Sequence, residues 1–425
     1  MGFQQGLSGL NATSKNLEII GNNIANANTY GAKSSRAEFS DMYANAINGA
    51  GSNAIGIGTN LAAVAQQFTP GSITNTGNAL DLAINGSGFF QLADPSGPIH
   101  YSRNGQFKID RDGFIVNNQE QKLMGYAADA SGVILPGTAT PLQLPTAGIA
   151  PAQTTRVTME LNLDSRAKVT NPGAGVVPQI DFNNPDTYNN ATSVTVFDAK
   201  GQDMTVTYYF QKVDTDQWNI FVTANGEPIA GTPADPGPLT ATPISFLSDG
   251  SGASIPVSAL PVSIGGPITT SSGAAIVTPM SFDLNMSRAT QYGASFGVTD
   301  MVQDGYAPGQ LTNIAIESTG VITARYSNGQ SKPAGQLELA NFRSPQGLQS
   351  MGGNSWTQTF ASGPAVTGVP NEGNMGVIQA GALEESNVDL TGELVSMITA
   401  QRVYQANAQS IKTEDQILQT IVNLR

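Results

Sequence analysis

The sequence predicts a mainly β fold with α-helical termini. The chain of 425 residues has 47 Gly and 24 Pro but only 12% charged residues, which is typical of many turns and short strands. Apolar residues recur every seven positions near the two ends, whereas apolar and polar residues alternate between them. We therefore expect the two ends to be helices that pair in a coiled-coil-like domain, followed by β-rich outer domains, one inserted in the other.

The N-terminal segment is predicted to be a helix with one apolar stripe. Seven-residue spacing places Phe3, Leu10, Leu17 and Ile24 on one side. The opposite face is rich in Asn, Thr and Ser, which are poor helix formers. An isolated copy of this helix would be weak in water, so its stability must come from packing.

The C-terminal segment repeats this pattern. The heptad positions are Leu390, Met397, Tyr404, Ile411 and Leu418. Either Asn387 or Asp389 could cap its start. Such stripes also occur on ordinary core helices of one globular domain, and that reading stays open from the heptads alone. The location of both stripes at the extreme ends favours a coiled-coil seam that brings the two ends of the chain together.

The chain between the helices predicts two β-rich domains. Alternating β-branched and aromatic residues occur at 80–92, 107–116, 193–210 and 218–226, with turn residues between them. From about 147 to 284 the composition shifts towards Pro, Thr, Ser and Gly. The predicted domains are a terminal helical domain with an extended N-terminal linker (1–71 plus 376–425), a β-rich middle domain (72–146 plus 285–375) and an inserted outer β domain (147–284).

Charge and composition exclude several functions. A net charge of −13 disfavours nucleic acid and anionic membranes, which attract basic surfaces. With no cysteine the chain has no disulfide and no thiolate metal site. It has no run of 18 apolar residues for membrane insertion and no basic and apolar leader, which is expected either of a cytoplasmic protein or of one exported without a cleavable signal peptide.

Candidate chemistry is sparse, and we predict no catalytic, cofactor-binding or metal-binding residues and hence no enzyme. His100 is the only histidine, and a lone histidine in a strand is most often structural. Residues 110–113 suggest a hairpin turn rather than a calcium loop. Adjacent Glu384 and Glu385 are expected in a solvated loop or at a helix start rather than as a catalytic acid pair.

Three stretches resemble the family of bacterial flagellar rod and hook axial proteins. The segment GNNIANANTYGAKSSRAEF (21–39) is similar to its Asn-rich signature, although Ala32 stands where an aromatic residue is usual. Residues 68–126 resemble its shared β region, and 381–425 resemble its C-terminal helix. The motif positions are Asn22, Asn23, Ala25, Asn26, Thr29, Gly31, Lys33, Ser386, Asn387, Val388, Asp389 and Leu390.

The resemblance is to hook members of this family in particular, because 161–165, 303–311, 325–330 and 335–356 look like theirs. It implies terminal helices that form a tube around an export channel, and a flexible helical homopolymer that acts as a universal joint and transmits torque outside the cell. The implied partners are further copies of the chain, the distal rod, hook cap and hook-filament junction proteins, and the flagellar export apparatus. The alternatives are a rod or hook-associated protein and, more remotely, a cell-wall hydrolase.

Overall fold

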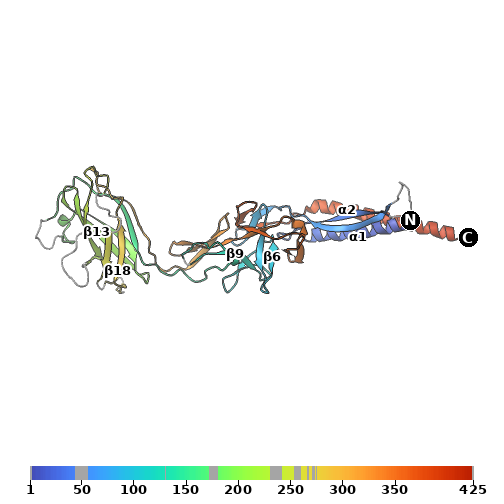
Figure 1. Cartoon of the computed structure of the whole chain (residues 1–425), viewed down its shortest axis with the longest axis horizontal. Coiled ribbons are helices and arrows are strands. Elements are labelled where there is room, and N and C mark those ends of the chain that lie inside the picture. The colour runs from blue at the N-terminus through green and yellow to red at the C-terminus, as the bar shows by residue number, and fades with distance from the viewer. Residues whose placement is uncertain are drawn as a thin grey trace. The chain divides into compact units, whose positions relative to one another are not determined.

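The computed structural model describes residues 2–43, 56–129, 131–171, 180–229, 242–252, 260–265, 268–269, 273 and 275–423. It divides into two compact units: residues 1–146, 312–325 and 331–425 form the first, and 147–311 and 326–330 form the second. Figure 1 shows two long helices at the chain ends and strands in both units. The predicted mainly β fold with helical termini is confirmed. The division into three domains stays a prediction.

Helix α1 (Gly2–Ala25) packs against helix α2 (Leu390–Asn423). Glycines of α1 allow the close approach. A Cβ added at Gly6 would lie 2.9 Å from Ile411 Cγ1, and one at Gly9 would lie 2.8 Å from Asn407 Nδ2. Glycine costs helix propensity, and here it is kept because a larger side chain would separate the helices.

A two-stranded antiparallel sheet lies along α1 (Figure 1). It consists of β1 (Ser35–Tyr43) and β2 (Gly56–Gln66). The Ser8 hydroxyl of α1 donates to the carbonyl of Thr59 and accepts from the Thr59 N–H at 2.8 Å. The Gln5 amide donates to the Gly56 carbonyl at 2.6 Å. These contacts fix the sheet on the helix through polar groups rather than through an apolar core.

The β body of the first unit is built from short antiparallel strands. Two pairs lie near the helices: β3 (Ile73–Asn75) with β28 (Ala382–Glu384), and β4 (Leu82–Asn85) with β27 (Val377–Ala380). The larger sheet contains β5 (Phe89–Ala93), β6 (Ile99–Ser102), β7 (Lys108–Ile109), β8 (Ile115–Val116), β9 (Lys122–Ala127), β10 (Thr140–Pro141), β20 (Leu311–Ile316), β21 (Val321–Tyr326), β22 (Ser331–Leu337), β23 (Leu339–Asn341), β24 (Gln349–Gly352), β25 (Ser355–Thr357) and β26 (Val366–Gly368).

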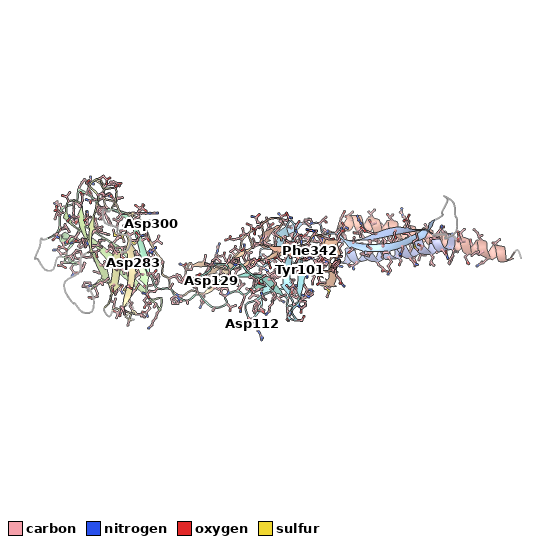
Figure 2. All side chains as sticks on the ribbon, in the orientation of Figure 1. Tyr101, Asp112, Asp129, Asp283, Asp300 and Phe342 are labelled. Atoms are coloured by element: carbon pink, nitrogen blue, oxygen red, sulfur yellow. The ribbon has the colours of Figure 1, made fainter. Side chains whose placement is uncertain are left out.

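Aromatic rings fill the core of this β body. Phe89, Tyr101, Phe342 and Trp356 are buried together, and the Tyr101 and Phe342 rings meet edge to face with centroids 4.7 Å apart (Figure 2). Edge-to-face rings gain about 0.5–1.5 kcal/mol beyond their burial. The predicted hairpin turn at 110–113 is confirmed, since strands β7 and β8 pair on either side of it.

The second unit is a sandwich of two sheets around one core. One sheet has the order β17 (Leu260–Ile264), β18 (Met280–Asn285), β11 (Arg156–Asn162) and β19 (Gly297–Gln303). The other has β12 (Asn190–Phe197), β13 (Asp203–Asp214), β14 (Gln217–Ala224) and β15 (Glu227–Pro228), with β16 (Thr242–Ser245) beside β14. Alternate residues point inward, as period-two strands require. Those of β13 are Met204, Val206, Tyr208 and Phe210.

Candidate functional site

The predicted seam residues lie on the paired helices but are incompletely covered. Phe3, Leu390, Tyr404 and Leu418 are exposed, and Leu10, Leu17, Ile24, Met397 and Ile411 are half-buried. Further apolar residues of α2, including Leu394, Val395 and Ile398, are exposed as well. The helices therefore bury one side against each other and leave a second apolar surface in contact with water. Because α2 has 34 residues and α1 has 24, part of α2 has no helical neighbour among the described residues.

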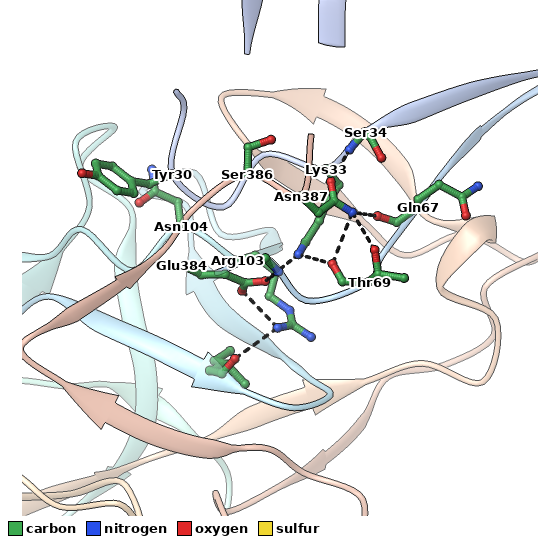
Figure 3. A network of polar contacts seen from close by, with 12 residues as sticks. Tyr30, Lys33, Ser34, Gln67, Thr69, Arg103, Asn104, Glu384, Ser386 and Asn387 are labelled. Carbon is green, nitrogen blue, oxygen red and sulfur yellow. Dashed lines mark hydrogen bonds and ion pairs between the residues drawn. The ribbon is translucent and has the colours of Figure 1, made fainter. Parts of the chain in front are cut away.

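A buried ion cluster lies where the helices join the β body (Figure 3). The Glu384 carboxylate accepts from Lys33 Nζ at 2.6 Å and from Arg103 Nη1 at 3.1 Å. These three side chains are at most 3% exposed. Two further bonds come from the cations: Lys33 Nζ donates to the Thr69 carbonyl and Arg103 Nη2 to the Gly86 carbonyl, each at 2.8 Å, whereas the buried Arg103 Nε has no hydrogen-bond partner among the described residues. The cluster ties three distant parts of the chain together.

Burial sets the electrostatics of this cluster. Removal from water lowers the pKa of Lys33 and of Arg103, and the adjacent Glu384 carboxylate partly opposes both shifts. One carboxylate thus favours the charged form of both cations, against the effect of burial. Removal of that carboxylate would leave two charges buried without compensation, which is far more costly than loss of an exposed ion pair.

Two asparagines of the predicted family motif connect the helices to the strands. Asn387 accepts from the Ser34 N–H at 2.7 Å and donates to the Gln67 carbonyl at 2.7 Å (Figure 3). Asn23 accepts from the Ser35 N–H, and its amide donates to the carbonyl of the same residue. Each asparagine side chain thus bonds to one backbone N–H and one backbone C=O, as a neighbouring strand would.

Asn23 also joins the two helices directly. Its amide nitrogen lies 2.9 Å from the Glu393 Oε1 of α2. Among the other motif residues, Asn26 bonds back to Asn22 and accepts from Thr29, closing the end of α1. Ala25 is exposed, and Ser386 and Val388 are half-buried near the start of α2.

Gly31 and Asp389 have identifiable backbone roles. Gly31 has φ +69°, and an added Cβ would lie 2.5 Å from the Asn104 nitrogen, so only glycine fits this turn. Its N–H donates to the Glu384 carbonyl at 2.8 Å. Asp389 caps α2, because its carboxylate accepts from the Thr391 N–H at 3.1 Å. Of the two candidate caps, Asp389 is therefore the one confirmed.

The sequence reading missed the ion cluster. The placement of Glu384 in a solvated loop or at a helix start was wrong, because Glu384 lies in strand β28 and is fully enclosed. One signal was available: Glu384 directly follows the apolar residues Ala382 and Leu383. His100 lies in β6, with its Nε2 3.9 Å from Asp94 Oδ2. Across the described ranges, no three His, Cys, Asp or Glu side chains gather in a way that could hold a metal ion.

Comparisons with known proteins define the class. Residues 3–33 match the model of the flagella basal body rod protein, and residues 379–424 match that of the C-terminal part of flagellar basal body rod FlgEFG proteins. Residues 125–306 match the flagellar basal body protein FlaE D2 domain. The Asn-rich motif, the paired helices and the β units together are those of an axial flagellar protein.

Full-length relatives specify the family further. The chain is 40% identical over 431 residues to the flagellar hook protein FlgE of Salmonella typhimurium, with 100% of both chains covered. It is 31% identical to FlgE of Borreliella burgdorferi, covering 99% of this chain and 98% of that one. The chain belongs to the flagellar hook protein FlgE family. It is a structural subunit of the bacterial flagellar hook, which is extracellular.

A solved structure agrees on the fold. The crystal structure of Helicobacter pylori flagellar hook protein FlgE2 matches with a TM-score of 0.51 at 13% identity, over 73% of this chain and 99% of that one. At this identity the likeness concerns the fold alone. Within the described residues, no helix is both long enough and apolar enough to cross a bilayer.

Proposed function

We propose that the chain polymerises through the exposed apolar surface of α1 and α2, so that these paired helices line a tube and the β units lie outside it as inserted domains. This proposal rests on one observation, which is that the apolar residues of both helices are only partly buried. Nine predicted seam residues, Phe3 to Leu418, are exposed or half-buried in the single chain. Apolar surface of this extent on ordered helices favours association.

The geometry of such an association favours a fibre. A contact between two different surfaces of identical subunits forms a closed ring only if the rotation from subunit to subunit returns to its start. Otherwise the contact continues as an open helix. A flexible tube of this kind would act as the universal joint that passes motor torque to the filament and would surround the export channel. Its ends would meet the distal rod protein, the hook cap protein and the hook-filament junction protein, and the export apparatus would deliver its subunits.

This role requires no catalysis, and we propose that the chain is not an enzyme and binds neither nucleic acid nor a cofactor. The alternative, a rod or other hook-associated axial protein, shares the terminal helices. The full-length matches to hook proteins favour the hook.

The experiment compares two aspartates on one helix. Ile398 of α2 is 52% exposed, so Ile398→Asp should leave the chain folded and abolish its polymerisation. Gln405→Asp, one heptad further on, adds the same charge at a residue that is already polar. Electron microscopy should show filaments for the wild type and for Gln405→Asp but none for Ile398→Asp.

Circular dichroism supplies the folding control. All three chains should have equal helical content and equal unfolding midpoints, because neither residue is buried in the single chain. Normal filaments from Ile398→Asp would refute the apolar seam.

A further inference from the structure

An aromatic side chain of the first unit is held out in water. Phe360 is 105% exposed, which means that no described part of the chain covers it. It lies in the turn between β25 and β26, in a neutral segment, Thr357–Val366. Burial of a Phe side chain is favourable, so this exposure leaves a favourable contact unused.

The turn that carries Phe360 is fixed by hydrogen bonds on both sides. The Thr359 hydroxyl donates to the Gly347 carbonyl at 2.6 Å and accepts from the Ala361 N–H at 3.1 Å. The Ser362 hydroxyl, itself in a buried residue, accepts from the Thr359 N–H at 2.9 Å. Because the backbone is fixed, the ring is presented in one place at little entropic cost on binding.

The same unit contains a pocket suited to an aromatic ring. A cavity of about 650 Å³ opens between β23, β26 and the segment that follows. Its walls include Phe342, Arg343, Val366, Gly368, Glu372 and Met375. Rings, thioethers and guanidinium groups all attract aromatic faces or edges. The lining contains one cation, Arg343, and one anion, Glu372, so its net charge is zero. A lining without net charge suits an uncharged loop.

We propose that Phe360 of one copy of the chain inserts into the Phe342–Met375 pocket of a second copy, forming a contact between β units outside the helical seam. This rests on the proposed polymerisation and names a second contact within it. The occupant is a second copy because this chain itself carries the fitting knob, uncovered and fixed, while its own pocket is open. Knob and pocket are different surfaces, so the contact extends a fibre.

The absence of cysteine makes a cross-linking test clean. Two single-cysteine chains, Ala361→Cys and Thr367→Cys, are mixed, polymerised and treated with a mild oxidant of thiols; Ala361 is exposed and lies next to Phe360, so the aromatic ring is kept. Thr367 lines the pocket and is exposed. A disulfide requires Cα atoms within about 7 Å, so mixed dimers should form only if the turn enters the pocket. Ala361→Cys mixed with Ser96→Cys, an exposed turn position, should give none.

A pocket variant provides a second arm. A Cβ at Gly368 would lie 3.5 Å from Met375 Cε, an ordinary contact, and Gly368 does not have the positive φ that strains other residues. Gly368→Leu should therefore fold normally and fill the pocket. Phe360→Ser and Gly368→Leu should each raise the critical concentration for polymerisation about tenfold, while Ser96→Ala leaves it unchanged.

The outcomes separate the two proposals. Wild-type chains that never polymerise would overturn both the seam and this contact. Filaments in which Ala361→Cys joins only itself, joins Ser96→Cys equally well, or joins nothing would overturn the knob and pocket and leave the seam standing. Unchanged critical concentrations for both Phe360→Ser and Gly368→Leu would do the same.

Discussion

The sandwich of the second unit and the terminal helices of the first differ in how completely they bury their apolar residues. In the sandwich, alternate residues of two sheets close on each other, and Tyr208, Phe210 and Trp218 are fully buried. On the helices, Ile20 and Ala400 are buried, whereas most heptad residues remain in contact with water. The sandwich completes its core within one chain, and the helices do not.

The difference follows from what each region is built from. A sandwich has two apolar faces that cover each other. Two paired helices cover one stripe each, and any wider stripe needs a third helix. The Lys33–Glu384–Arg103 cluster stabilises the base of this incompletely buried helix pair. Polar contacts hold the elements together there, as the apolar core does in the sandwich.

Removing a large core side chain from the sandwich should give the largest effect. Trp218→Ala deletes a fully buried ring and should cost about 3–5 kcal/mol of unfolding free energy in the second unit. Ile398→Ala on α2 should cost less than about 1 kcal/mol in the single chain, because that side chain is half in water. Denaturant titration measures both.

Polymerisation should reverse this ranking. Ile398→Ala should weaken filament assembly, whereas chains with Trp218→Ala should assemble at temperatures where the second unit stays folded. If both variants lost the same free energy of unfolding in the single chain, the apolar face of the helices would already be buried there. The helices and the sandwich would then not differ in burial.

Breaking the ion cluster should give the next effect. Glu384→Gln keeps an acceptor for the Gly71 N–H but leaves Lys33 and Arg103 buried without a counter-charge. We expect a loss of about 3 kcal/mol in the first unit, at the low end for a broken buried pair. Thermal unfolding monitored through Trp356 fluorescence, in a Trp218→Phe background so that only the first unit contributes, would report it.

The neighbouring carboxylate is the matched control. Glu385 is half-buried and its backbone, rather than its side chain, bonds to Ser72. Glu385→Gln should change stability by less than about 0.5 kcal/mol. A similar loss from both substitutions would mean that the first unit responds to net charge rather than to the cluster.

The sequence predicted what depends on local pattern. Heptads located the terminal helices, alternation located the strands of the sandwich, and the Asp112-Gly113 pair located a hairpin. Each signal lies within a few consecutive residues, because helix and strand periods are local properties. The cap of α2 was partly predicted as well, since Asp389 was one of two candidates.

Long-range pairing was not readable in the same way. Lys33, Arg103 and Glu384 are up to 351 positions apart, and nothing in their local sequence says that they meet. Buried charges are rare, so Glu384 beside Glu385 was read as solvated. The motif residues Asn23 and Asn387 were identified by resemblance, but their function of replacing a strand for Ser34 and Ser35 needs the three-dimensional arrangement.

The smallest predicted effect concerns the start of α2. Asp389→Ala removes the acceptor of the Thr391 N–H and should cost about 1 kcal/mol, whereas Asp389→Asn keeps a capping oxygen and should be nearly neutral. Hydrogen exchange at residues 391–393 measures the local opening. In the single chain α2 gains little from its exposed apolar face, so the loss of its cap should open this first turn. In the filament, neighbouring chains should cover that face, and the loss of the cap should have no visible effect. Equal exchange rates in both states would mean that neighbours add nothing to α2, and the helices would then resemble the sandwich after all.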